Sequence, residues 1–336
     1  MPLSGKFILL IMIVFLSMTA CSENGIDLTG IGEPANEPAG AVQGNIGGGA
    51  GSSDVPQGET RAVVSISEIL IPSTGNVYIY QDGVTIDTSN VNNGYVKVRY
   101  TGNAARIAAQ LIIHNITYIF EIDPNGRWEI LPLAQGNGVY TLNVLENIEG
   151  SIFALIISTD FTVQLNNPFL PFLYPNQFVN FNQNSRAVAL AAQLAEGAVG
   201  ELDVVSNIYH YIINNIEYDF EKAVAIAEGR ITSYIPDIDA TLASGRGICF
   251  DYASLMTAML RAQLIPTRLV IGYVSGGIYH AWIEVYTQEY GWVGAAQFRG
   301  PEQIWTLMDP TFSAGQAADL AAFIGDATNY EPVFLY

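Results

Sequence analysis

The spacing of apolar residues divides the chain into a region of short strands and a region of helices. Between Arg61 and about Asn166, short runs rich in β-branched and aromatic residues alternate with clusters of Gly, Pro, Asn and Asp. Such runs are typical of antiparallel strands joined by tight turns. The pattern predicts strands at residues 63–65, 95–100, 109–113, 117–122, 139–144 and 152–157.

This spacing of short strands favours an antiparallel β-sandwich over residues 61–166. The Cys-Trp-Cys core of antibody domains is absent, so the sandwich is immunoglobulin-like only in its layers. A proline-rich connector, residues 167–184, follows. The expected fold class is therefore α+β, with a β-sandwich first and a mixed helix and strand domain over residues 185–336.

The helical period begins at Ser185. Residues 185–198 are rich in alanine, and residues 201–215 place Leu202, Val205, Ile208 and Ile212 on one stripe of a helix. Residues 221–229 predict a further helix that ends at its glycine. After a glycine-containing loop, Tyr252 to Leu260 again repeat at helical spacing, and Pro266 prevents continuation.

A hairpin is expected directly after that helix. Residues 267–274 read as one strand, Ser275-Gly276-Gly277 as a tight turn and residues 278–286 as the returning strand. Alternation along the second strand puts His280, Trp282 and Glu284 on one face.

The first residues have the pattern of an export signal. Lys6 precedes an apolar run over residues 7–18, and Cys21 follows small residues. Residues 1–20 resemble a bacterial lipoprotein signal peptide, which implies cleavage before Cys21 and its lipidation. An ordinary signal peptide followed by an incidental cysteine is the alternative. Residues 21–60 are rich in Gly, Ser, Pro, Asn and Glu, so we expect a flexible tether that holds the protein extracytoplasmically at the cell membrane or envelope.

Composition excludes some partners. The formal net charge is −19 and the chain has only three lysines, so no basic patch is available for nucleic acid. His114 and His210 are remote from His280, and no Cys/His spacing indicates zinc. We therefore expect neither a metal nor another cofactor; the oligomeric state remains open at this point.

Cys249 is the candidate nucleophile. If Cys21 is lipidated, the chain holds no second thiol for a disulfide. Cys249 begins the helix expected after the glycines, and a helix N-terminus favours a thiolate over a thiol. A histidine packed near such a cysteine can act as a general base, and a carboxylate can orient the imidazole. His280 and Asp309 are the candidates. The alternatives are a buried core cysteine, a structural histidine and an aspartate that forms a turn before Pro310.

The order Cys, His, Asp resembles the transglutaminase-like superfamily, which has a papain-like core. The resemblance covers roughly Val204 to Phe312. The matching pieces are residues 215–219, Gly247-Ile248-Cys249-Phe250-Asp251-Tyr252-Ala253, residues 260–268, Gly272-Tyr273, His280-Ala281-Trp282-Ile283-Glu284-Val285 and Met308-Asp309-Pro310-Thr311. It implies that Cys249 is the nucleophile, His280 the base and Asp309 the orienting acid.

The sequence departs from the family in three places. Leu264 stands where the family usually has glycine, residues 293–304 separate two tryptophans, and no papain-type oxyanion glutamine precedes Cys249. Tyr218 is a candidate second oxyanion donor, with a packed aromatic as the alternative. Trp282, Trp292 and Trp305 are candidate walls of a cleft, although tryptophans beside a sheet are more often core.

Two function classes follow. The favoured one is a membrane-tethered cysteine enzyme that hydrolyses peptide or isopeptide bonds through a thioester, by analogy with bacterial family members. A cross-linking transglutaminase, which passes the acyl group to an amine, is the alternative within that class. The second class is a non-catalytic surface protein whose β domain binds a partner. In all of them the expected contacts are the membrane, through Cys21, and a peptide or protein.

Overall fold

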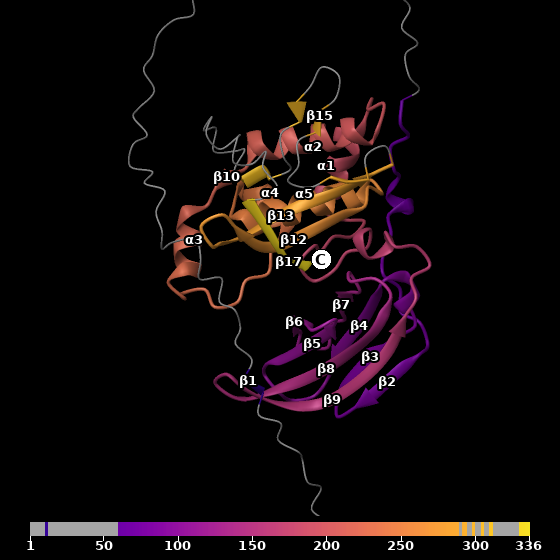
Figure 1. The fold of residues 1–336 in the computed structure, drawn as a ribbon, viewed down its shortest axis with the longest axis vertical. Helices are drawn as coiled ribbons and strands as arrows, with labels where there is room; N and C mark the ends of the chain where they lie inside the picture. The colour runs from indigo at the N-terminus through magenta and orange to yellow at the C-terminus, as the bar shows by residue number, and fades with distance from the viewer. Residues whose placement is uncertain are drawn as a thin grey trace, which may run out of the picture.

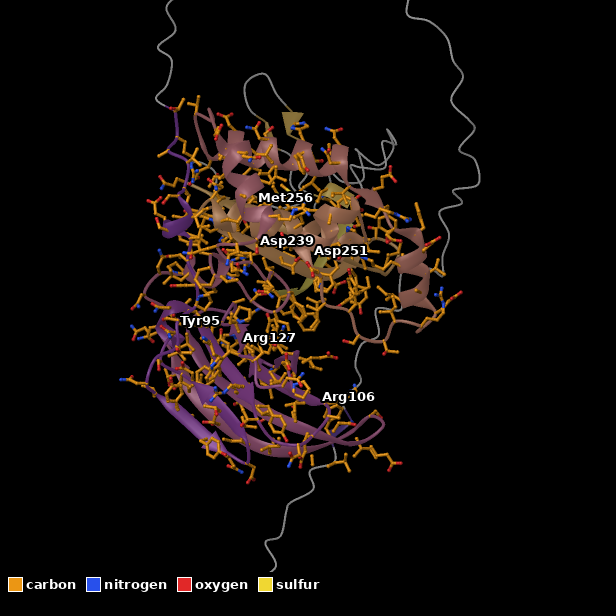
Figure 2. The ribbon with its side chains drawn as sticks, turned by 180° about the vertical axis from the view of Figure 1, so that it is seen from behind. Tyr95, Arg106, Arg127, Asp239, Asp251 and Met256 are labelled. Carbon is orange, nitrogen blue, oxygen red and sulfur yellow. The ribbon has the colours of Figure 1, made fainter. Side chains whose placement is uncertain are left out.

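The computed structural model describes residues 11–12, 60–288, 291–293, 298–299, 304–305, 309–311 and 329–336. For residues 11–12, 293, 298–299 and 304–305 only the backbone is described. The chain has an α+β fold in two parts, a pair of β-sheets and a group of helices packed on a further sheet (Figure 1). Figure 2 shows the same two parts from behind, with Tyr95 and Arg127 in the part made of sheets and Asp251 and Met256 among the helices.

The first part is a β-sandwich. One sheet has the order β1-β9-β8-β5-β6 and the other the order β2-β3-β4-β7, and all the pairs are antiparallel. Val98, Leu111 and Leu142 belong to the apolar core that the two sheets share. The strands are β1 Ile11–Met12, β2 Tyr78–Gln81, β3 Val84–Asp87, β4 Tyr95–Tyr100, β5 Ile107–Ile113, β6 Ile116–Ile122, β7 Glu129–Pro132, β8 Gly138–Glu149 and β9 Ile152–Val163.

The sequence prediction is wrong at the beginning of the sandwich. Residues 63–65 are not a strand, and they lead into the short 3₁₀ helix η1, Ile66–Glu68. The first hairpin is instead β2–β3, around Asp82-Gly83. Both residues have positive φ, 46° and 87°, which is the backbone that a two-residue hairpin turn requires. The strands β8 and β9 also extend well beyond their predicted ends, because their antiparallel pairing continues from Gly138 opposite Val163 to Glu149 opposite Ile152.

The second part begins with helices. They are α1 Arg186–Ala195, α2 Glu201–Asn215, α3 Phe220–Ala227, α4 Ile238–Ser244 and α5 Cys249–Ala262. Of these, α4 was not predicted; Asp237 caps its N-terminus by accepting from the backbone N–H groups of Asp239 and Ala240. The strands are β10 Glu217–Tyr218, β11 Arg246–Gly247, β12 Thr267–Val274, β13 Ile278–Thr287, β14 Gly291–Val293, β15 Phe298–Arg299, β16 Ile304–Trp305 and β17 Tyr330–Leu335.

Helix α5 is the centre of this part, and every residue of it is buried. It packs against α1, α2, β12 and β13. After it, Leu264 has a φ of 54°, so a leucine occupies a left-handed position that favours glycine. This conformation reverses the chain at the end of the helix. The Leu264 and Ile265 N–H groups donate to the carbonyls of Arg261 and Leu260 and stabilise the reversal.

The β12–β13 hairpin has the predicted form. Gly276 and Gly277 have φ values of 91° and 76°, and the Gly277 N–H donates to the Val274 carbonyl at 3.0 Å. In the sheet order β14-β13-β12-β17, β12 lies between β13 and the C-terminal strand. The register places Gly272 opposite His280.

The connector between the two parts, which contains η3 Leu170–Phe172, is packed against both. The ring of Phe178 contacts Phe120 of the sandwich and Phe250 of α5. The buried Arg261 guanidinium donates to the carbonyls of Thr267, Tyr174 and Tyr336 at 2.9, 2.7 and 2.6 Å. Burial lowers the pKa of Arg261 to about 9. These contacts hold the connector, the hairpin and the C-terminal strand around the end of α5.

Apart from the β1 backbone and Thr60, the expected signal segment and tether lie outside the described residues. Cys21 lies outside them as well. In the parts of the chain that are described, no helix combines the length and the apolar character needed to cross a bilayer.

Candidate active site

The residues before α5 fix where Cys249 lies. Strand β11 runs parallel to β10, with Gly247 opposite Tyr218, and Ile248 then serves as the N-cap of α5. The Ile248 N–H donates to Asp251 Oδ2 at 2.8 Å. A side chain at Gly247 would bring its Cβ within 2.6 Å of the Asp251 Cβ, so glycine is required there. Cys249 is the first residue of the helix, as the sequence predicts.

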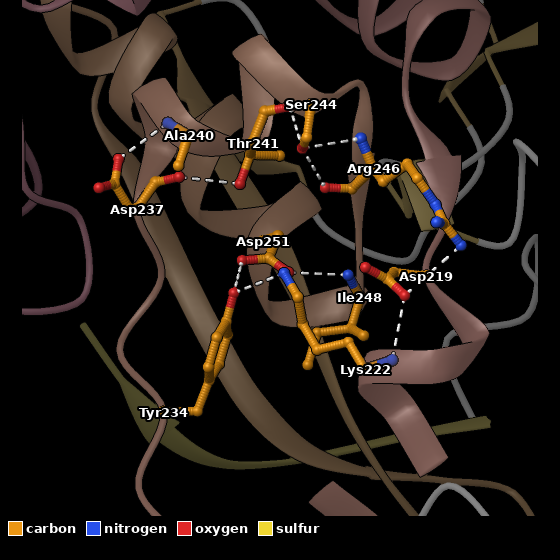
Figure 3. A network of polar contacts seen from close by, with 10 residues as sticks. All are labelled: Asp219, Lys222, Tyr234, Asp237, Ala240, Thr241, Ser244, Arg246, Ile248 and Asp251. Carbon is orange, nitrogen blue, oxygen red and sulfur yellow. Dashed lines mark hydrogen bonds and ion pairs between the residues drawn. The ribbon is translucent and has the colours of Figure 1, made fainter. Parts of the chain in front are cut away.

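A buried polar network supports this helix start (Figure 3). The Asp251 carboxylate is fully buried and accepts from Lys222 Nζ at 3.0 Å and from the Tyr234 hydroxyl. Lys222 Nζ also donates to the Tyr234 hydroxyl oxygen at 2.8 Å. Burial first, and then the charge of Asp251, raises the pKa of Tyr234 well above its ordinary value. Tyr234 therefore keeps its proton and remains a donor.

Sequence reasoning missed this network. Two signals for it were present: an aspartate at the third position of α5, where a side chain can cap the helix, and one of only three lysines of the chain. The long distances in sequence between the members hid their contact.

The structure brings His280 and Asp309 together. His280 Nε2 lies 2.7 Å from Asp309 Oδ2, and the two side chains are 4% and 0% exposed. Asp309 Oδ1 also accepts from the Thr311 N–H at 3.2 Å. A carboxylate at Nε2 holds the neutral imidazole in the tautomer with its proton on Nε2, which leaves the Nδ1 lone pair for other chemistry.

Cys249 lies near the start of β13. Helix α5 packs on that strand, and Ala281, Ile283 and Val285 join the core that contains α5. The pKa of Tyr279, the residue before His280, is raised mainly by burial and further by the charges of Tyr273 and Cys249. The charge of Cys249 thus acts on the residue that precedes the histidine, on the strand against which α5 packs. Cys249 is itself 5% exposed, so thiol and imidazole are both largely shielded from water.

The other predicted site residues have varied surroundings. Tyr218 is half-buried in β10, with its ring edge-on to Phe220. Trp282 is buried beside the histidine, with the two ring planes 16° apart. Trp292 packs on Phe172, and the Arg268 guanidinium lies 3.7 Å from the centre of its ring. The side chain of Trp305 lies outside the described residues.

Asp309 differs from its predicted local structure. In the sequence, Trp305 to Thr311 reads as a strand that ends at Pro310, whereas Asp309 lies in no helix or strand and Pro310 and Thr311 are helical. The described strand nearest before them is β16, which covers only Ile304–Trp305. Among the described side chains, no three His, Cys, Asp or Glu residues are grouped to hold a metal ion.

Taken together, a helix-start thiol near a buried imidazole–carboxylate pair has the parts needed for nucleophilic catalysis. The imidazole can exchange a proton at Nδ1, and the carboxylate stabilises the imidazolium that forms. The backbone N–H groups of the first turn of a helix favour an oxyanion or thiolate.

Relatives in two bacteria share part of this chain. A protein-glutamine gamma-glutamyltransferase of Pseudomonas aeruginosa is 29% identical over 130 residues, 38% of this chain and 18% of that protein. The uncharacterised protein YebA of Bacillus subtilis is 28% identical over 125 residues, 32% of this chain and 17% of that protein. The chain thus spans less than a fifth of the length of either relative.

A solved structure of a provisionally assigned cysteine protease from Cytophaga hutchinsonii is 18% identical. It covers 72% of this chain and 76% of its own, with a TM-score of 0.37. The family model described as the transglutaminase-like superfamily matches residues 188–295, which include α5 and the β12–β13 hairpin. Residues 188–295 of this chain therefore form a domain of the transglutaminase-like superfamily.

Proposed function

We propose that this protein is a cysteine acyl-transfer enzyme that hydrolyses peptide or isopeptide amide bonds. Cys249 is the nucleophile, His280 the general acid and base, and Asp309 the group that orients the imidazole. The observation that carries the proposal is the buried His280–Asp309 pair at 2.7 Å, next to the helix that begins with Cys249.

The reaction follows from the atoms available. The Cys249 thiol first gives its proton to His280 Nδ1, and the thiolate then attacks the amide carbonyl carbon, so that the oxygen gains the charge. The tetrahedral intermediate collapses as His280 Nδ1–H gives its proton to the leaving nitrogen, and a thioester remains. Water then attacks the thioester and gives a proton to Nδ1, and the thiolate leaves. The backbone N–H of Cys249 is the proposed first oxyanion donor and Tyr218 the second.

Amine transfer is the second candidate. It is favoured by the name of the Pseudomonas aeruginosa relative, a protein-glutamine gamma-glutamyltransferase. In that case a primary amine replaces water in the second step and forms a new amide. The two reactions share every step up to the thioester, so the acceptor alone distinguishes them.

The test is incubation of the purified protein with peptide libraries, with and without a primary amine, followed by mass spectrometry. Cleavage or deamidation is expected, and a new amide mass would identify amine transfer instead. Cys249→Ala and His280→Ala should abolish the reaction while circular dichroism stays unchanged. His210→Ala is the matched control, because His210 is exposed on α2. Retained activity in either site variant would contradict the proposal.

A thiol-directed probe tests the activation of Cys249 without a substrate. Alkylation by iodoacetamide should be fast in the wild type and slow in His280→Ala. Equal rates would favour the second function class, a non-catalytic surface protein built on this scaffold.

We further propose that the protein is tethered to the membrane by lipidated Cys21, as its sequence context supports. The expected result is partition of the full chain into the detergent phase and incorporation of a fatty-acid analogue. Both should be lost in Cys21→Ala, while Cys249→Ala should keep both. Soluble wild-type protein would contradict the tether.

A further inference from the structure

A tyrosine on the C-terminal strand reaches the carboxylate of the His280–Asp309 pair. Tyr330 is the first residue of β17 and lies opposite Val274 at the end of β12. Its hydroxyl donates to Asp309 Oδ2 at 3.2 Å, within a buried environment. Both Tyr330 and Asp309 lie beyond residues 188–295, which match the family model.

The donors around Asp309 come from different parts of the chain. His280 Nε2 and the Tyr330 hydroxyl share Oδ2, while the Thr311 N–H bonds Oδ1. A carboxylate bound through one oxygen only can rotate about its Cβ–Cγ bond. Donors on both oxygens restrict this rotation, so Oδ2 stays directed at the imidazole.

Tyr330 is equipped to remain a donor. Burial first, and then the charge of Asp309, raises its pKa far above the ordinary value. The phenol therefore keeps its proton whenever the carboxylate is ionised. A hydrogen bond from a hydroxyl to a carboxylate is also stronger than one between neutral groups.

Ring packing fixes the position of this hydroxyl. The Tyr330 ring meets Trp282 edge-on, with centroids 5.1 Å apart, and Trp282 in turn lies beside His280 at 6.3 Å. The tryptophan thus contacts both residues that donate to Asp309 Oδ2.

Gly272 allows the strand to come this close. A Cβ at Gly272 would lie 2.1 Å from the Glu331 carbonyl oxygen and 2.9 Å from the Trp282 ring. The pairing of β12 with β17 also shifts register between Ile271 and Gly272. The absence of a side chain at Gly272 therefore leaves room for the Trp282 ring and for the Glu331 backbone.

We propose that Tyr330 is a positioning residue of the active site, which acts through Asp309 to hold the His280 imidazole in its reactive orientation. The inference rests on the proposed function of the Cys249, His280 and Asp309 group. It assigns part of that site to β17, a strand outside the matched family domain.

A double-mutant cycle on the full chain tests this role. Tyr330→Phe removes only the hydroxyl and should slow alkylation of Cys249 by iodoacetamide on the order of 10-fold, the value of a hydrogen bond to a charged group. In an Asp309→Ala background the same change should alter the rate less than about 2-fold, because residues that act through one another are not additive. For a peptide cleaved by the wild type, kcat should fall and KM should stay unchanged.

The matched control is Tyr140→Phe. Tyr140 is also buried and donates to a carbonyl, that of Gly136 at 3.0 Å, but it lies in the sandwich. Both tyrosine variants lose one buried hydrogen bond, so some loss of thermal stability is expected from each, whereas the slowed alkylation is expected from Tyr330→Phe alone. If Asp309→Ala does not fold, Asp309→Asn is the second background, where a neutral acceptor should reduce the Tyr330 effect.

The outcomes separate the two proposals. If His280→Ala and Asp309→Ala slow alkylation but Tyr330→Phe does not, the role of Tyr330 is overturned and the proposed function stands. Equal effects of Tyr330→Phe in both backgrounds would also overturn it. If alkylation does not respond to His280→Ala, both proposals fail.

Discussion

Two fully buried carboxylates, Asp251 and Asp309, each accept hydrogen bonds from a backbone N–H, a tyrosine hydroxyl and a basic side chain. Asp251 accepts from a backbone N–H, from the Tyr234 hydroxyl and from Lys222 Nζ. Asp309 accepts from a backbone N–H, from the Tyr330 hydroxyl and from a histidine nitrogen. In both cases burial and the neighbouring carboxylate raise the pKa of the tyrosine.

The difference lies in the basic partner. In the Asp251 group the partner is a lysine, whose Nζ forms an ion pair with Asp251 Oδ2 at 3.0 Å. In the Asp309 group the partner is an imidazole, which has a second ring nitrogen, Nδ1, that can exchange a proton with a reacting group. The same donor set thus supports the start of α5 in one place and the proposed proton transfer in the other.

The largest effect that distinguishes the two groups is expected from Asp309→Asn. An amide at this position holds the imidazole in the wrong tautomer, so turnover should fall roughly 10³–10⁴-fold. The free energy of unfolding should change less than in Asp251→Asn, which loses an ion pair and a helix cap. Steady-state kinetics and urea denaturation of both variants check this. Equal losses of stability, with turnover reduced only in proportion, would show that both groups are structural.

The second effect concerns Lys222→Met. The variant loses the α3 cation that pairs with the buried Asp251 carboxylate. This should lower the free energy of unfolding by about 3 kcal/mol. Urea denaturation measures it. The control is Arg230→Met, because the Arg230–Glu228 pair is exposed and should contribute less than about 1 kcal/mol. Similar losses in the two variants would mean that the Asp251 network is not a fixed ion pair.

A smaller effect is expected from Tyr234→Phe. The variant loses one hydroxyl that donates to Asp251, at a cost of about 1–2 kcal/mol in the free energy of unfolding. Tyr80→Phe, on an exposed ring of β2, should leave the stability unchanged. If Tyr234→Phe costs more than Lys222→Met, the tyrosine and not the lysine is the main support of the carboxylate.

The smallest effect concerns a third buried carboxylate, Glu129, whose cation Arg127 is largely exposed. Burial raises the pKa of Glu129 above its ordinary value of 4.5, even though Gln177 and Arg127 lower it. The folded state therefore keeps a proton at pH values where the unfolded chain has lost it. Stability contributed by this proton is present below the unfolded pKa and is lost as pH rises through the folded value.

Glu129→Gln should accordingly flatten the fall in the free energy of unfolding as pH rises above the ordinary glutamate pKa of 4.5. Denaturation curves across that range measure the slope. Glu149→Gln, which removes a negative charge from an exposed position of β8, controls for net charge. An unchanged slope in Glu129→Gln would indicate that Arg127 compensates the buried charge, as Lys222 does for Asp251.

Local patterns were sufficient for α5 and for the hairpin after it. Helical spacing before Pro266 and two glycines between alternating strands depend only on neighbouring residues. The same kind of signal was present but missed for β2–β3, where Asp82-Gly83 marks a turn, and for α4, which Asp237 caps. In these cases the information was local and the interpretation incomplete.

The strand prediction for residues 63–65 was wrong for a different reason. The composition of this segment favours a strand, yet the Arg61 guanidinium donates to the Gln263 carbonyl at 2.6 Å. The Val64 N–H also donates to the Gln263 side chain at 3.3 Å. The segment is held by partners about two hundred positions away, which no local pattern encodes.

The sequence by itself determined the order of Cys249, His280 and Asp309, the helix that begins at Cys249 and the strand that carries His280. It did so because periodicity and motif spacing are properties of short stretches. Only the tertiary structure decided that Tyr330 donates to Asp309, and that Lys222 and Tyr234 support Asp251. Those hydrogen bonds join residues on different elements, whose approach depends on how α5 packs against the sheet and on the room that Gly272 leaves for β17.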